Sequence, residues 1–167
     1  MFPDGMKRQA IVFLEAMRSR SLKFASAESC TGGLIAALLT EIPGSSDVVD
    51  RAFVTYSNEA KTEMLGVDAA LVSEFGAVSR EVALAMAEGA LAHSAADVSV
   101  AVTGIAGPGG GTAAKPVGLV HIAAARAGSE TLHKECRFGP LDRSDIRART
   151  VVEALALAAR AMEAPAG

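Results

Sequence analysis

Apolar residues near the start of the chain recur at the spacing of an α-helix. Met6, Ala10, Phe13, Leu14 and Met17 follow one another at intervals of four, three, one and three residues, so they share one helical face. The rest of the chain alternates between short apolar runs and amphipathic segments. Strands are predicted over residues 22–27, 98–102, 117–125 and 131–138, with the end of a further strand at residues 53–56. Helices are predicted over 31–39, 58–65, from 79 onward and from 142 onward.

The order of these segments predicts the fold class. Strands separated by helices are typical of an α/β protein, in which helices cover both faces of the sheet. The last two predicted strands lie close enough in the chain to form a hairpin near Gly128, which makes the sheet mixed. We therefore expect a single domain over residues 1–167, a three-layer α/β/α sandwich on a mixed sheet.

The composition excludes several function classes. Of 167 residues, 50% are hydrophobic, so the chain can bury a core and is not disordered. Lys and Arg number 16 against 19 Asp and Glu, and this net charge of −3 does not favour nucleic acid or an anionic membrane as partner. No uncharged run reaches the roughly 18 residues of a membrane span, and the first residues lack the layout of a signal peptide. We expect a cytoplasmic protein.

The two cysteines, Cys30 and Cys136, are too few for a disulfide framework. No CxxC motif or Cys/His cluster with the spacing of metal ligands occurs in the sequence. We therefore expect no metal and no other cofactor.

The first candidate site is the segment Ala27-Glu28-Ser29-Cys30-Thr31-Gly32-Gly33, where a predicted strand passes into a helix. Ser29 would stand at the carboxyl end of that strand, where open α/β sheets bind ligands. Amides near Thr31, Gly32 and Gly33 could face an oxyanion or a phosphate. On spacing alone, Ser29 or Thr31 could instead be a helix cap, and Cys30 could be a rival nucleophile or a small buried residue.

A serine nucleophile needs a base. His93, His121 and His133 carry no motif around them and are interpreted as structural residues. Tyr56 is the only tyrosine, and Lys61 follows it in the next predicted helix. Lys61 could act as a base if burial lowered its pKa, but spacing alone favours a surface lysine.

The third feature is the glycine-rich loop from Gly104 to Pro116. It does not match the phosphate-loop pattern, because Lys115 stands between Ala114 and Pro116, and no helix follows it as a dinucleotide fingerprint requires. The loop could still approach a ligand closely through its backbone, with Lys115 on a phosphate, or be a surface connection.

Together these segments resemble the CinA C-terminal domain family, whose characterised members are nicotinamide-nucleotide amidohydrolases. The resemblance rests on AESCTGG, FVTYSNEAK with GAVS, and TGIAGPGGG with KPVG, and runs from about Phe24 to Val120. It implies an anticodon-binding-domain-like α/β/α sandwich that hydrolyses the carboxamide of nicotinamide mononucleotide to the acid and ammonia. It also implies Ser29 as nucleophile, assisted by Tyr56 and Lys61.

Residues that the resemblance and the loop composition point to for the oxyanion or the substrate are Thr31, Gly32, Gly33, Thr103, Gly104, Gly107, Gly111, Lys115, Arg143 and Arg147. Family members commonly carry Gly-Asp-Arg before the last helix, whereas this chain has Gly139-Pro140-Leu141-Asp142-Arg143. The chain also lacks the molybdopterin-binding-like domain of longer relatives, so we expect a stand-alone amidohydrolase. A non-catalytic nucleotide-binding module and an amidase with another substrate are the alternatives. The Ala-rich helices suit a homodimer.

Overall fold

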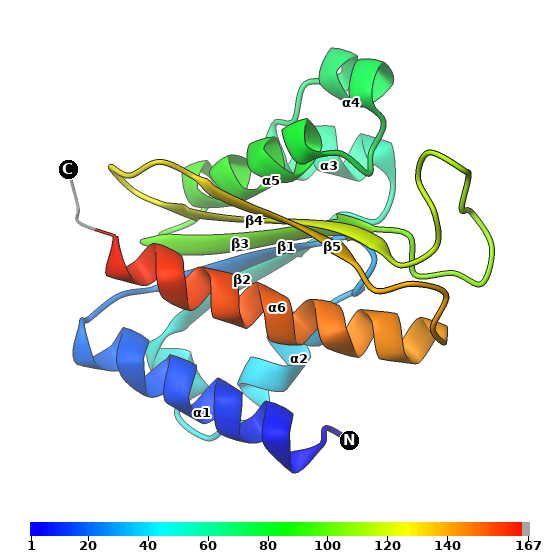
Figure 1. The fold of residues 1–167 in the computed structure, drawn as a ribbon. Coiled ribbons are helices and arrows are strands. Elements are labelled where there is room, and N and C mark those ends of the chain that lie inside the picture. Colours follow the sequence, from blue (N-terminus) through cyan, green and yellow to red (C-terminus); the bar gives the residue numbers. More distant parts are fainter. Residues whose placement is uncertain (165–167) are drawn as a thin grey trace.

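The computed structural model describes residues 1–164, which are built on one five-stranded sheet (Figure 1). The strands are β1 (Phe24–Glu28), β2 (Val49–Val54), β3 (Val98–Gly104), β4 (Leu119–Arg126) and β5 (Leu132–Arg137), arranged in the order β2-β1-β3-β4-β5. β1 runs parallel to β2 and β3, while β4 is antiparallel to both β3 and β5. The sheet is therefore mixed, and β4 and β5 form the predicted hairpin.

Helices cover both faces of the sheet, as Figure 1 shows. One face carries α1 (Asp4–Ser19), α2 (Leu34–Thr40) and α6 (Arg143–Glu163), and the other carries α3 (Asn58–Leu65), α4 (Ala69–Phe75) and α5 (Arg80–Ala92). A short 3₁₀ turn, η1 (Ser45–Asp47), precedes β2. The predicted α/β class and mixed sheet are confirmed, although the predicted range 1–167 extends three residues beyond those described.

The two hydrophobic cores differ in the size of the side chains that the sheet contributes. Toward α1 and α6 the strands present large residues such as Phe24 and Ile122, whereas toward α5 they present alanines. Those alanines are Ala25, Ala27, Ala101, Ala123 and Ala125. The two faces can differ in this way because alternate residues of a strand point to opposite faces. The small side chains on the second face let α5 approach the sheet closely.

The largest differences from the sequence prediction concern the start of α2, the end of β2 and the presence of α4. The helix expected from residue 31 begins at Leu34, because Gly32 and Gly33 take positive φ angles of 59° and 100° that a helix does not tolerate. β2 covers residues 49–54, so it ends two residues before the strand end predicted at residues 53–56. Helix α4 was not predicted, because Val72 is its single buried residue and gives no periodic pattern. None of the helices in residues 1–164 is long and apolar enough to span a bilayer.

Candidate active site

Ser29 lies directly after β1, in a tight turn at the carboxyl end of the parallel strands. Its amide donates to the carbonyl of Val102 on β3 at 3.1 Å, and its carbonyl accepts from the amide of Gly32 at 3.1 Å. This second bond closes a four-residue turn with Cys30 and Thr31 at its centre. The predicted place of Ser29 at the strand end is confirmed, and the edge is the one where α/β sheets bind ligands.

The buried carboxylate of Glu28 holds this turn in place. Its Oε2 accepts from the hydroxyl of Thr31 at 2.7 Å and from the amides of Gly33 and Ile35 at 3.1 and 3.0 Å. Its Oε1 accepts from the hydroxyl of Ser26 and the amide of Ala36, both at 3.0 Å. A carboxylate here satisfies amides at the start of α2 that would otherwise lack a partner.

The sequence analysis missed Glu28, although an acidic residue between an apolar strand and a helix start was a usable signal. Its contacts also correct part of the expected oxyanion site. The amide of Gly33 and the hydroxyl of Thr31 are bound to Glu28, and the amide of Gly32 is bound to Ser29. Within residues 1–164, the amides of Cys30 and Thr31 donate to no other residue, so these two remain available to an oxyanion.

Lys61 reaches the turn from α3, which Ser57 caps by accepting from the amide of Ala60. Its Nζ lies 3.2 Å from the Oγ of Ser29, in hydrogen-bond contact. The same nitrogen donates to the carbonyl of Thr55 at 2.9 Å and to that of Ser57 at 3.3 Å. Only 1% of the lysine is exposed, so the surface-lysine alternative is wrong.

Burial has opposite effects on the reactivity of two neighbouring groups. It lowers the pKa of Lys61, against the opposing influence of the Glu59 carboxylate, so the neutral amine becomes easier to form. It raises the pKa of Cys30 to about 12, which keeps the thiol protonated and unreactive. The structure therefore favours Ser29 over Cys30 as nucleophile.

Tyr56 does not extend toward the Ser29–Lys61 pair. It is 61% exposed, and its hydroxyl accepts a hydrogen bond from Arg143 at 3.1 Å. Its hydroxyl contacts neither Ser29 nor Lys61 among the hydrogen bonds of residues 1–164; its backbone carbonyl lies 3.5 Å from the Nζ of Lys61. Tyr56 therefore does not relay a proton between Ser29 and Lys61 in this arrangement.

Two arginines from the first turns of α6 contact the site. Arg143 donates to the carbonyl of Gly107 at 2.8 Å as well as to Tyr56, so it joins the glycine-rich loop to the strand end of β2. Arg147 donates to the carbonyls of Cys30 and Thr31 at 3.2 and 2.8 Å. Within residues 1–164 neither arginine forms an ion pair, so both positive charges are uncompensated by a carboxylate.

Three glycines of the glycine-rich loop that were expected to touch substrate are packed against neighbouring residues, where a side chain would not fit. A Cβ on Gly104 would lie 2.6 Å from the Cγ2 of Val120, and one on Gly107 or Gly111 would lie 2.7 or 2.8 Å from atoms of Val117. These glycines let the loop pack against the start of β4, a need that composition alone did not indicate.

The two other residues expected near the substrate in this region have protein partners. The Thr103 hydroxyl donates to the carbonyl of Ala77 at 2.7 Å, and the Lys115 ammonium donates to the carbonyl of Phe75 at 2.6 Å, at the end of α4. Each contact ties the strand or the loop to the segment that precedes α5. In this arrangement both side chains connect parts of the protein.

The histidines form contacts away from the nucleophile. Nδ1 of His121 lies 3.0 Å from Nε2 of His133, and the 5.3 Å between ring centroids means that the rings meet edge to edge. Burial lowers the pKa of both. Nδ1 of His93 lies 2.9 Å from the carbonyl of Gly89 at the end of α5. These contacts fit the structural roles expected for the three histidines.

Two surface clefts lie away from Ser29 and Lys61. A cleft of about 510 Å³ lies between α3 and α4, lined by Asn58, Glu59, Thr62, Glu63, Ala69, Val72 and Ser73. A smaller one of about 220 Å³ lies between α1 and α6. Neither is lined by Ser29 or Lys61. In residues 1–164 no three His, Cys, Asp or Glu side chains are grouped as metal ligands.

Fold and site together define a class: an α/β/α domain that holds a serine against a buried lysine at the carboxyl ends of its parallel strands. The model of the CinA C-terminal domain family matches residues 7–162, so the chain belongs to that family. The competence/damage inducible protein CihA from Agrobacterium tumefaciens has the same fold. Its crystal structure has a TM-score of 0.92 and 54% identity, over 94% of this chain and 95% of that one.

A second solved structure, of the competence-damaged protein (CinA) superfamily protein from Escherichia coli, has a TM-score of 0.87 and 31% identity, over 94% of this chain and 91% of that one. Among curated sequences, a CinA-like protein of Akkermansia muciniphila is 54% identical over 140 residues. Those residues are 84% of this chain but 34% of that relative. The chain thus spans about a third of the length of such relatives.

Proposed function

We propose that this chain is an amidohydrolase that converts nicotinamide mononucleotide to nicotinic acid mononucleotide and ammonia. The observation that carries the proposal is the 3.2 Å contact between the Oγ of Ser29 and the Nζ of the buried Lys61. A serine beside a lysine of lowered pKa is an arrangement for nucleophilic attack on a carbonyl carbon. The reaction itself comes from the family resemblance of AESCTGG, FVTYSNEAK and TGIAGPGGG.

In this mechanism Lys61, in its neutral form, takes the proton of Ser29 as the oxygen attacks the carboxamide carbon. The amides of Cys30 and Thr31 then hold the negative oxygen of the tetrahedral intermediate. Lys61 returns the proton to the leaving nitrogen, and ammonia departs. Water, deprotonated by the same lysine, hydrolyses the acyl-enzyme and releases the acid. The positive pyridinium ring of the substrate makes its carboxamide easier to attack.

The substrate phosphate would bind near Arg143. This guanidinium is exposed, carries no carboxylate partner within residues 1–164, and is oriented by Gly107 and Tyr56. Arginine recognises phosphate through paired N–H donors, so an arginine that is already oriented suits this role. Tyr56 would then act by fixing Arg143 instead of relaying a proton.

The test is ammonia release from nicotinamide mononucleotide, with nicotinamide and the dinucleotide as comparison substrates. We expect Ser29→Ala to lose several powers of ten in turnover, whereas the matched variant Cys30→Ala, one residue along, keeps most of it. A dead Cys30→Ala beside an active Ser29→Ala would establish a thiol mechanism instead. No ammonia from the wild-type chain would favour a non-catalytic module.

A second variant tests the base. Because burial lowers the pKa of Lys61, turnover should rise with pH through a single ionisation below the usual lysine range of about 10.4. Lys61→Arg keeps the positive charge but cannot lose its proton, so it should be nearly inactive at every pH. Near-normal turnover by Lys61→Arg would show that the lysine is a binding contact and not the base.

A further inference from the structure

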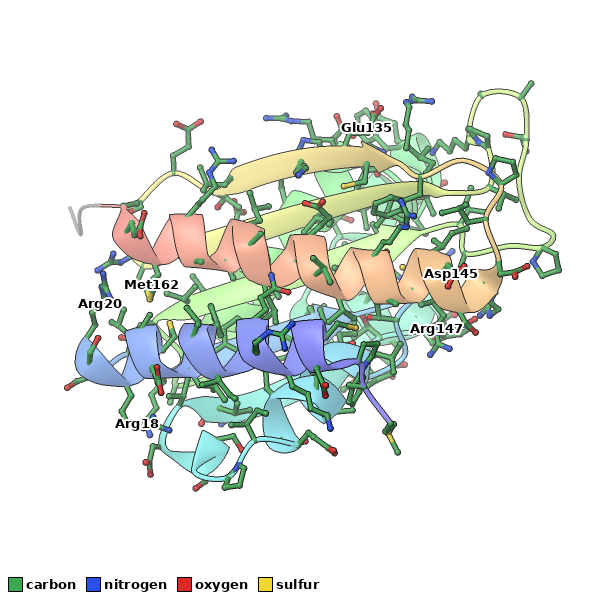
Figure 2. The ribbon with its side chains drawn as sticks, turned by 60° about the horizontal axis from the view of Figure 1, so that its bottom comes forward. Arg18, Arg20, Glu135, Asp145, Arg147 and Met162 are labelled. Carbon is green, nitrogen blue, oxygen red and sulfur yellow. The ribbon has the colours of Figure 1, made fainter. Side chains whose placement is uncertain are left out.

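We infer that Arg147 is the positioning residue of the oxyanion hole, an assignment that rests on the proposed function. The residue lies near the N-terminal end of α6, where Figure 2 labels it. Its Nε donates to the carbonyl of Cys30 at 3.2 Å and one terminal nitrogen donates to the carbonyl of Thr31 at 2.8 Å. It therefore holds the carbonyls of both central residues of the turn that presents Ser29.

The direction of these bonds determines where the free amides point. In a trans peptide, the carbonyl and the following N–H point in opposite directions. The carbonyl of Cys30 shares its peptide with the amide of Thr31, so the Arg147 bond directs that N–H away from the arginine. The Thr31 amide has no hydrogen-bond acceptor within residues 1–164.

The next peptide shows what lies on the side opposite the arginine. The carbonyl of Thr31 is bound by Arg147, and the amide of Gly32 in the same peptide donates to the carbonyl of Ser29 at 3.1 Å. The N–H of Gly32, which lies opposite the Arg147 contact in this peptide, thus points back toward Ser29. Arg147 also polarises the peptides it binds, which strengthens the N–H at their other end.

Two further features suit a positioning role. Arg147 is supplied by a helix of 21 residues whose neighbouring positions Ile146 and Thr150 are buried, so its backbone is held rigidly. It is itself half-buried, and two of its nitrogens are committed to backbone carbonyls. The guanidinium of Arg143, in contrast, is exposed and better placed to bind a phosphate.

The experiment compares Arg147→Ala and Arg147→Lys with a matched control, Arg149→Ala, an exposed arginine two residues along the same helix. Turnover and KM for nicotinamide mononucleotide are measured alongside circular dichroism and thermal unfolding. Because one lost oxyanion donor costs about 10²–10³ in turnover, we expect loss of its positioning residue to lower kcat by about 10–100-fold. KM should change less than about threefold, because ground-state binding is retained. Arg149→Ala should match wild type.

Free guanidinium, added well below denaturing concentrations, should restore part of the kcat of Arg147→Ala and none of that of Ser29→Ala. If Arg147→Ala is unfolded, Arg147→Lys carries the test, since its ammonium can bind one carbonyl. A raised KM with unchanged kcat would make Arg147 a phosphate ligand, and unchanged kinetics would give it a purely structural role. Either result would overturn this inference and leave the proposed function standing. An inactive wild-type chain would overturn the proposed function first.

Discussion

The buried carboxylate of Glu28 gives the sharpest stability prediction, because every one of its contacts is known. It accepts five hydrogen bonds, three of them from the backbone amides of Gly33, Ile35 and Ala36. Glu28→Ala would remove the acceptor for all three amides and leave a cavity beside them. Helix α2 has only seven residues, so it has few other interactions with which to compensate.

The expected cost follows from those contacts. A buried donor left without its acceptor costs about 1–3 kcal/mol. Three amides give about 3–9 kcal/mol before relaxation, and entry of water into the vacated space should bring the loss to about 3–5 kcal/mol. In Glu28→Gln, the Oε2 contacts can remain and Ser26 can reverse its hydroxyl, but the new amide group would oppose the N–H of Ala36. We expect that variant to lose about 1–3 kcal/mol.

Urea denaturation followed by circular dichroism measures these differences as changes in the free energy of unfolding. Glu41→Ala is the matched control, because its exposed carboxylate near the end of the same helix lies 3.9 Å from the ammonium of Lys7. Such a surface pair contributes about 0–1 kcal/mol. Ammonia release should also fall in Glu28→Ala, since the turn of Ser29 loses its support. A loss of stability below about 1 kcal/mol in Glu28→Ala would refute this account of the turn.

Three further outcomes are expected. Thr55→Val should leave the free energy of unfolding unchanged or raise it slightly, because the buried Oγ1 of Thr55 lacks a hydrogen-bond partner within residues 1–164; clear destabilisation in urea would contradict this. Gly104→Ala should lower the free energy of unfolding by about 1–3 kcal/mol in the same assay, because its Cβ would lie 2.6 Å from the Cγ2 of Val120. Wild-type stability in this variant would show that β3 and β4 move apart without cost. The folded protein lowers the pKa of His121 and His133, so the stability they contribute is complete above their unfolded pKa of about 6.5 and is lost as pH falls below it. A double variant, His121→Gln with His133→Gln, should therefore show a flatter profile of unfolding free energy between about pH 7 and 5.5. An unchanged profile would assign the pH dependence to other groups.

Much of the fold follows from patterns that are local in the chain. The buried face of α1 is predicted correctly, and α3 and the start of α6 are predicted almost to the residue, because apolar spacing and capping residues act over one or two turns. Ser29 is predicted for the same reason, since a strand end, a serine and two glycines stand together in the sequence. Helix α4, with one buried residue, lacks such a pattern and was missed.

The contacts that give the site its chemistry join residues far apart in the chain. Lys61 and Ser29 are 32 positions apart, and Arg147 and Cys30 are 117 positions apart. No sequence spacing encodes such distances, because they depend on how β1, α3 and α6 pack around one sheet. Burial is decided in the same way: it makes Lys61 a candidate base and Cys30 an unreactive thiol. Local sequence therefore determined the elements and the nucleophile candidate, while tertiary packing decided which side chains meet and which protons they can release.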